Sequence, residues 1–191
     1  DLLLKDDYVE SIPYCWNGLN KKLQGIRIGE LVLLAAGSGT GKSLVCRELA
    51  HHIISKGQNV AYIALEENVK RSIRGLVSIG VNAPIHNPEV RKNIPENKIV
   101  SEWEKIKDKV FFYDHFGSSD SDDLINRIRY MVQALGCRYV FLDHISIVIS
   151  GLQEGDERRL IDNTMTRLRK LVEELKIAMV VVSHLKRVEG K

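Results

Sequence analysis

Cysteine, proline and tryptophan are scarce in this chain of 191 residues, which contains three, four and two of them. The cysteines, Cys15, Cys46 and Cys137, are scattered, form no CxxC pair and cannot all be bonded to one another. Reduced conditions suit them best, so we expect a cytoplasmic protein. A chain of this length can bury about 70% of its unfolded surface, so its core should form without disulfide or metal crosslinks.

Long hydrophobic runs are also missing. The longest, such as Leu31–Ala36, have about six residues, whereas a membrane-spanning helix needs about 20. Residues Asp1–Asp7 have neither a basic region nor an apolar stretch, so no secretory signal is expected. The net charge of +3 is too small to indicate a nucleic-acid partner by itself. These features exclude a membrane-spanning protein and leave the function open.

The apolar residues, 44% of the chain, follow the pattern of an α/β fold. Short apolar runs typical of strands buried on both faces alternate with longer segments in which apolar residues recur every three to four positions. This alternation predicts a mostly parallel sheet with helices on both faces. The predicted strands are 31–36, 60–65, 110–114, 139–144 and 178–185, and the predicted helices are 44–55, 100–109, 124–135 and 160–175.

Two segments lack this periodicity. Residues 1–30 contain Pro13 and the turn-forming pair Asn17-Gly18, and we interpret them as a lead-in or linker segment. Residues 81–98 contain the other three prolines and should form a surface loop or lid. The sequence therefore predicts one domain, residues 31–191, preceded by a connecting segment.

The first predicted strand runs directly into a glycine-rich turn, which a helix follows. This context is typical of a P-loop, in which backbone N–H groups and the helix N-terminus surround phosphates. Lys42 supplies a charge for the β- and γ-phosphates, and the Ser43 hydroxyl is placed to bind Mg²⁺. A turn without a ligand rarely carries Gly-Lys-Ser at this position, although Ala36 stands where the stricter motif has glycine. The predicted nucleotide-binding residues are Ala36, Gly37, Ser38, Gly39, Thr40, Gly41, Lys42 and Ser43.

Polar residues stand at the C-terminal ends of three other predicted strands: Glu66, Asp143 and His184. We expect these groups to lie near the P-loop, because the carboxyl ends of parallel strands form the ligand-binding edge of such sheets. Asp143 has the form of a Walker B aspartate, which holds Mg²⁺ beside Ser43, although a lone aspartate there is often a turn cap. Glu66 is the candidate general base for the attacking water, with Glu67 as the alternative. His184 is a candidate sensor of the γ-phosphate, against the simpler interpretation of a surface histidine.

Several segments match a known family in order and spacing. They are 39–43 (GTGKS), 65–67 (LEE), 142–148 (LDHISIV), 156–158 (DER), 161–163 (IDN) and 183–186 (SHLK). On these motifs the chain resembles the hexameric replicative helicases of the DnaB-like, RecA-fold group, and in particular the Twinkle-like helicase domains of phage primase-helicases. The resemblance covers nearly the whole chain, and the LDHISIV segment is much more specific than a P-loop alone.

The resemblance implies a RecA-like P-loop NTPase core with the spatial strand order 3-2-4-5-1, with strands numbered along the chain. It also implies hydrolysis of ATP or dTTP with Mg²⁺ between identical subunits of a hexameric or heptameric ring that holds single-stranded DNA. A primase domain or other replication proteins would be further partners, in the cytoplasm of a phage-infected bacterium or, second, in the mitochondrial matrix. The matching positions make Lys42, Glu66 and His184 the catalytic residues, and Ser43 and Asp143 the metal ligands.

The resemblance places DNA contacts just after the last predicted strand. Lys186 and Arg187 would contact the phosphate backbone, and the loop 150–156 is a further candidate for facing the channel. The alternative is that Lys186, Arg187 and Lys191 form a solvated basic end. The family's arginine finger, base-contacting residues and later strands would follow Lys191, so we expect a C-terminally incomplete domain in which strand 31–36 is an exposed edge.

Three other functions share part of this pattern. A RecA-like or clock-type ATPase has the P-loop and strand-end carboxylates, but is not expected to carry the sequence Asp143-His144-Ile145-Ser146. A small-molecule kinase would need acceptor-binding and lid arginines, and obvious ones are not apparent. A third function is a nucleotide-binding module that has no activity on its own.

Overall fold

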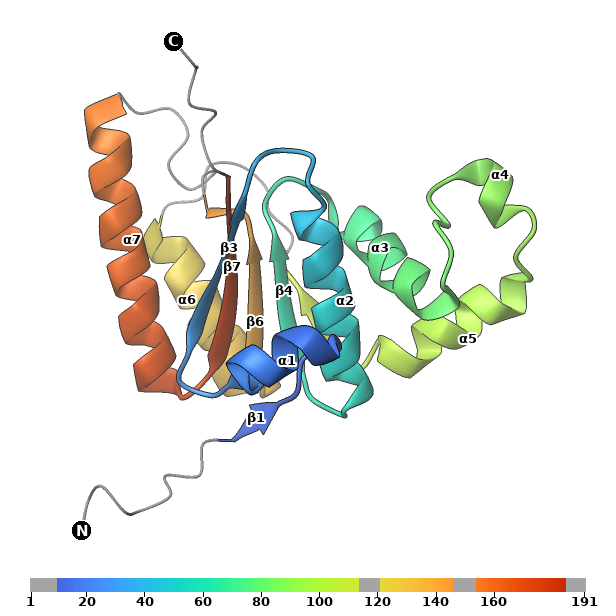
Figure 1. Ribbon diagram of the computed structural model, residues 1–191, viewed down its shortest axis with the longest axis horizontal. Coiled ribbons are helices and arrows are strands. Elements are labelled where there is room, and N and C mark those ends of the chain that lie inside the picture. The colour runs from blue at the N-terminus through green and yellow to red at the C-terminus, as the bar shows by residue number, and fades with distance from the viewer. Residues whose placement is uncertain (1–9, 114–120, 146–153, 185–191) are drawn as a thin grey trace.

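A computed structural model of the protein describes residues 10–113, 121–145 and 154–184, and shows a sheet between two layers of helices (Figure 1). This arrangement confirms the predicted α/β class. The strands are β1 (Ser11–Ile12), β2 (Ile26–Arg27), β3 (Leu31–Ala36), β4 (Val60–Ala64), β5 (Val110–Phe112), β6 (Tyr139–Asp143) and β7 (Ala178–His184). The helices are α1 (Asn17–Leu23), α2 (Lys42–Ser55), α3 (Val69–Val81), α4 (Pro88–Arg91), α5 (Glu96–Ile106), α6 (Ser121–Leu135) and α7 (Glu154–Leu175).

The main sheet has five parallel strands in the order β3-β7-β6-β4-β5. Counted along the chain and taken from the β5 edge, this order is 3-2-4-5-1, the one that the family resemblance implied. Each of these five strands begins at the residue predicted from the sequence. The register pairs Ala36 with His184 and Ala64 with Asp143, so the polar groups at these strand ends lie at one edge of the sheet.

Both faces of the sheet are buried, because successive side chains along a strand point to opposite sides. Tyr62 and Phe141 belong to a cluster that includes residues of α2, α3 and α5. Ile63 and Leu142, their neighbours in sequence, belong to a second cluster formed with α6 and α7. None of these four side chains is more than 1% exposed. Burial on both faces explains the nearly continuous apolar runs that marked these strands in the sequence.

The helix α7 has 22 residues and packs one stripe of side chains onto the sheet. Leu168, Leu171 and Val172 are buried on that stripe, as the spacing predicted. The solvent-facing side is charged, and Arg169 and Glu173 form an ion pair there at 2.7 Å. No helix in the described ranges combines the length and the apolarity needed to cross a membrane.

The described part of residues 1–30, where the sequence predicted a connecting segment, is packed onto the domain. It contains β1, β2 and α1, and Ile26 is fully buried in the core cluster that contains Tyr62. Arg138, just before β6, binds Glu10 through two hydrogen bonds of 2.6 and 2.8 Å. Sequence periodicity does not reveal such a segment, because two-residue strands carry no repeat and the contacts are with distant residues.

Residues 81–98, where the sequence predicted a loop or lid, include a short helix and the first turn of a longer one. The helix α4 starts at Pro88, and the side chain of Asn87 accepts a hydrogen bond from the backbone N–H of Glu89. Proline is favoured at the first position of a helix, so Pro88 starts a helical turn here. In Figure 1, α4 lies at the end of the molecule farthest from α7, beyond α3 and α5.

Candidate nucleotide-binding site

The glycine-rich turn between β3 and α2 has the backbone conformation that a phosphate loop requires. Gly39 and Gly41 have φ angles of 76° and 90°, in the left-handed region that other residues rarely adopt. Gly41 is the N-cap of α2, so the first N–H groups of that helix face the turn. The helix N-terminus carries partial positive charge, and the turn is therefore suited to an anion.

Lys42 places its ammonium group at this turn. Its Nζ donates hydrogen bonds to the carbonyl oxygens of Ala36, at 3.0 Å, and Gly37, at 2.5 Å. The residue is 6% exposed, so the charge is held in place by its surroundings. The Thr40 hydroxyl also donates to the Gly37 carbonyl, at 2.9 Å, which closes the turn on itself.

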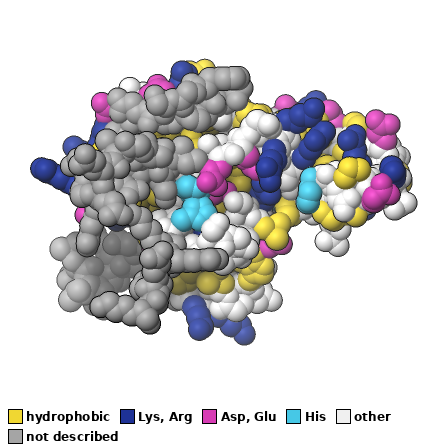
Figure 2. Space-filling view, turned by 90° about the horizontal axis from the view of Figure 1, so that it is seen from above, with side chains coloured by type: hydrophobic (Ala, Val, Ile, Leu, Met, Phe, Trp, Pro, Cys, Tyr) yellow, Lys and Arg dark blue, Asp and Glu magenta, His cyan; other side chains and the backbone are white. Residues whose placement is uncertain are grey.

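A cavity of about 220 Å³ lies where the strands end, directly beside the start of α2. Three of the predicted site residues, Ser43, Glu66 and Asp143, line it together. Asp143 is 7% exposed, at the end of β6. Figure 2 looks onto this edge of the sheet and shows histidine, acidic and basic side chains close together near its middle. The structure thus brings the oxygen ligands expected for Mg²⁺ to the same cavity as the candidate base.

The two adjacent glutamates at the end of β4 have different surroundings. Arg47 donates two hydrogen bonds to Glu67, at 2.7 and 2.8 Å, and the Ser72 hydroxyl donates a third, at 2.7 Å. The Glu67 side chain is 12% exposed. The Glu66 side chain is 55% exposed and faces two histidines. Glu67 is therefore held as a structural group, whereas Glu66 is open to water.

His144 and His184 both lie beside the Glu66 carboxylate. His144 Nε2 hydrogen-bonds to Glu66 Oε1, and His184 Nε2 lies 4.0 Å from Glu66 Oε2. The two imidazole rings meet edge to face with centroids 4.0 Å apart. Burial, followed by the electrostatic influence of His144 and Lys42, lowers the pKa of His184 below its usual 6.5. A neutral His184 at pH 7 keeps one N–H to donate and one nitrogen to accept.

Arg47 lines the cavity and His144 contacts Glu66, and neither was assigned a role from the sequence. Arg47 lies one helical turn after Ser43, on the same side of α2, and this spacing of four residues could have indicated it. The side chain of Arg47 crosses Gly75 of α3, where a Cβ atom would leave no room for it. His144 follows Asp143 within the LDHISIV segment, but nothing in the sequence alone turns its ring toward Glu66.

The DNA-binding candidates cannot be placed in the same way. Lys186, Arg187 and Lys191 lie outside the described residues, as does most of the loop 150–156. The described chain reaches His184, two residues before Lys186. These assignments therefore stay predictions.

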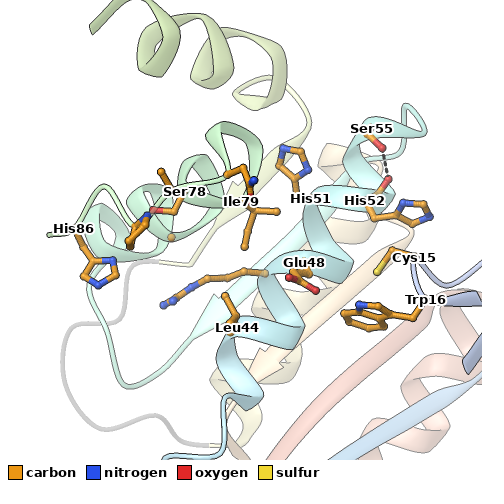
Figure 3. A pocket seen from close by; sticks show the side chains of 15 residues that line it. Cys15, Trp16, Leu44, Glu48, His51, His52, Ser55, Ser78, Ile79 and His86 are labelled. Atoms are coloured by element: carbon orange, nitrogen blue, oxygen red, sulfur yellow. Dashed lines mark hydrogen bonds between the residues drawn. The ribbon is translucent and has the colours of Figure 1, made fainter. Parts of the chain in front are cut away.

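A larger cavity, of about 560 Å³, lies between α2 and α3 and is shown in Figure 3. The side chains of Glu48 and His51 on α2 and of Ile79 on α3 line it, with Trp16 at one side. None of the described residues around it belongs to the turn 36–43, although Arg47 borders both cavities. The anion-binding backbone and the candidate metal ligands meet at the smaller cavity, which makes it the candidate for the nucleotide.

Comparisons with known proteins identify relatives of the chain. A family model described as the DnaB-like helicase C terminal domain matches residues 11–191. A DNA helicase/primase of Enterobacteria phage T3 is 37% identical over 177 residues, covering 90% of this chain and 31% of the phage protein. The replicative DNA helicase DnaB of Geobacillus stearothermophilus is 21% identical over 187 residues, covering 96% of this chain and 41% of that protein. The chain thus spans less than half the length of either relative.

A solved structure agrees with these relatives. A DnaB-like replicative helicase, whose structure was solved to show its interactions with primase, superimposes with a TM-score of 0.79 at 19% identity. The match covers 97% of this chain and 47% of that one. At this level of identity the likeness concerns the fold, and the role of each side chain has to be argued from its own surroundings.

Proposed function

This chain belongs to the family of DnaB-like helicase C-terminal domains, and on that basis we propose that it is the NTP-hydrolysing motor of a replicative DNA helicase. A P-loop, a buried aspartate and an open glutamate at one edge of the sheet support an NTPase site. The names of the phage and bacterial relatives support helicase activity. Because the chain covers only part of those relatives, unwinding is proposed for the larger protein to which the domain contributes.

In this proposal the phosphates of ATP or dTTP lie on the turn 36–43. The Lys42 ammonium exchanges the carbonyl oxygens of Ala36 and Gly37 for phosphate oxygens, which are stronger acceptors because they are charged. Ser43 and Asp143 offer a hydroxyl and a carboxylate, the oxygen ligands that Mg²⁺ prefers. When bound, the ion neutralises the charge that builds up on the phosphates during transfer.

Glu66 is the proposed general base. It accepts a proton from water as the water oxygen bonds to the γ-phosphorus, and the bond to the bridging oxygen breaks with its electron pair leaving on the nucleoside diphosphate. The observation that carries this assignment is the contrast with Glu67, whose carboxylate is already held by Arg47 and Ser72. His184, beside Glu66, is proposed to contact the γ-phosphate and to lose that contact after hydrolysis.

The proposed assembly is a ring of identical subunits, hexameric or heptameric, with single-stranded DNA in its channel. Lys186 and Arg187 are the proposed contacts to the DNA backbone, which would make binding independent of sequence and sensitive to salt. A primase domain or other replication proteins are the proposed partners, since the phage T3 relative is named as a helicase/primase. The phage relative also supports the cytoplasm of an infected bacterium as the compartment.

Two substitutions test the proposed site. Lys42→Ala should abolish nucleotide binding or hydrolysis, because it removes the only side-chain cation proposed to meet the phosphates. Glu66→Gln should leave binding unchanged and reduce turnover by about 10²- to 10⁴-fold, the usual contribution of a general base. Binding is measured by titration with a fluorescent nucleotide, and turnover by phosphate release. Normal turnover by the Glu66 variant would remove Glu66 from the role of base, and binding without turnover in the unmodified chain would favour a nucleotide-binding module.

A further inference from the structure

Two histidines and a glutamate meet where β4, β6 and β7 end. Glu66, His144 and His184 each offer one ligand atom, and these three atoms all lie within 4.8 Å of one another. His144 Nε2 hydrogen-bonds to one carboxylate oxygen of Glu66, and His184 Nε2 lies 4.0 Å from the other. Two imidazole nitrogens therefore face a single carboxylate from different strands.

We propose that Glu66, His144 and His184 form a binding site for a transition-metal ion of the Zn²⁺ type. Zinc takes histidine nitrogen and carboxylate oxygen at about 2.0–2.2 Å, and sites with three protein ligands leave one coordination position open. In a tetrahedral shell with these bond lengths the ligand atoms lie about 3.4 Å apart. His144 Nε2 and Glu66 Oε1 are already closer than this, at hydrogen-bond distance, and no two of the three ligand atoms are more than 4.8 Å apart. Shifts of about 1 Å therefore bring all three atoms to the spacing that encloses an ion.

The burial of the three side chains suits such a movement. The His144 side chain is 7% exposed and the His184 side chain 29%, so both rings are held by the surrounding structure. The Glu66 side chain is 55% exposed and can rotate to share an ion with the two imidazole nitrogens. Two fixed ligands and one movable ligand give a site that can close without rearrangement of the backbone.

The proposed site differs in chemistry from the magnesium ligands. Ser43 and Asp143 offer oxygen only, which suits Mg²⁺, whereas two imidazoles favour zinc and its neighbours in the transition series. Millimolar Mg²⁺ should therefore not displace zinc from the histidines. An ion bound to Glu66 would occupy the carboxylate that accepts the proton, so zinc would inhibit hydrolysis. This consequence rests on the proposed function, whereas binding of the ion does not.

Isothermal titration of the 191-residue chain with Zn²⁺, in buffer containing Mg²⁺ and no nucleotide, tests the site. We expect one ion bound per chain with Glu66 and His184 intact, and a loss of affinity of at least about 10-fold in Glu66→Gln and in His184→Ala. Both positions are partly exposed, so these variants should fold, which circular dichroism can verify. The controls are Ser43→Ala for the magnesium site and Cys15→Ser for the exposed thiol, and both should leave zinc affinity unchanged.

Two results would overturn the site: no saturable zinc binding, or equal zinc affinity in the Glu66 and His184 variants and the unmodified chain. Inhibition is then measured as phosphate release at increasing Zn²⁺ in excess Mg²⁺, with half-inhibition expected at the zinc concentration that half-fills the site. Zinc that binds through Glu66 and His184 but leaves turnover unchanged would overturn the inhibitory consequence and also count against Glu66 as base. The site itself would stand on the titration.

Discussion

At the scale of single residues, two neighbouring glutamates of the site have different roles: Glu67 stabilises the structure, and Glu66 is the proposed base. Glu67 is enclosed by Arg47, Ser72 and, at 3.5 Å, Arg71. Glu66 points to the histidines and to water. The sequence left both glutamates open as candidate bases. Two adjacent glutamates at the end of a strand differ in role only through the side chains that contact them, and the sequence does not show those contacts.

The Glu67 carboxylate should be needed for stability rather than for chemistry. Glu67→Gln removes the charge that pairs with Arg47, whose side chain is only 19% exposed, so a largely buried guanidinium loses its partner. We expect the free energy of unfolding to fall by about 1–3 kcal/mol, measured by urea denaturation. Turnover per folded molecule should change far less than in Glu66→Gln. If the Glu67 variant were as stable as the unmodified chain but had no turnover, Glu67 rather than Glu66 would be the base.

At the scale of elements, one carboxylate joins three helices on the α2 side of the sheet. Glu102 of α5 passes over Gly80 of α3, where a Cβ atom would leave no room. It then accepts a hydrogen bond from His51 of α2 at 2.8 Å and another from Lys105 at 3.0 Å. The residue is 7% exposed, so the contact is well shielded from solvent.

The contribution of Glu102 to stability should depend on pH. Burial by itself raises the pKa of Glu102, but the hydrogen bonds from His51 and Lys105 outweigh it, and the pKa lies below the usual 4.5. The stabilisation is therefore fully present above pH 4.5 and is lost as the pH falls through the lowered value. Glu102→Gln should lower the melting temperature at pH 7, and the difference from the unmodified chain should shrink as the pH is lowered below 4.5. A difference that stays constant with pH would contradict the ionic contribution.

The segment β1–α1–β2 should also be part of the folded unit. Gly25 has a φ of 94°, and a Cβ atom there would lie 2.9 Å from the carbonyl oxygen of Ile12. Gly57, at the end of α2, has a similar φ of 83° with nothing within 4 Å. Gly25→Ala should therefore destabilise the protein by about 1–3 kcal/mol more than Gly57→Ala, because only the former adds a clash to the backbone strain. Equal effects on urea denaturation would show that the segment β1–α1–β2 unfolds independently of the rest of the domain.

Sequence patterns were sufficient to predict elements that a contiguous stretch of the chain specifies. Strands such as 139–143 are buried on both faces and so appear as continuous apolar runs, and the P-loop is a contiguous motif. The segment β1–α1–β2 escaped prediction because Ile12 and Ile26 are buried in a core cluster whose other members, such as Phe141 and Val180, lie far along the chain. His144 escaped for a related reason: its partner, Glu66, lies 78 positions away and on another strand. What could not be predicted was the pairing of side chains across elements.

At the scale of the whole molecule, the strand order places the proposed chemistry next to the proposed DNA contacts. The strand β7 lies between β3, which leads into the P-loop, and β6, which ends in Asp143. It ends at His184, two residues before Lys186 in the sequence. A change in the contacts of His184 after hydrolysis would therefore act on the chain immediately before the proposed DNA-binding residues. This short connection is the proposed link between the bound nucleotide and the binding of DNA.

The most direct test of the motor is phosphate release from ATP and dTTP across a series of protein concentrations, with and without single-stranded DNA. If the site is completed between neighbouring subunits, turnover should rise faster than linearly with protein, and single-stranded DNA should increase it. The DNA effect should weaken as salt is raised, because backbone contacts release counterions. Turnover that is linear in protein concentration and indifferent to single-stranded DNA would contradict the account, leaving a P-loop NTPase that is not a helicase motor.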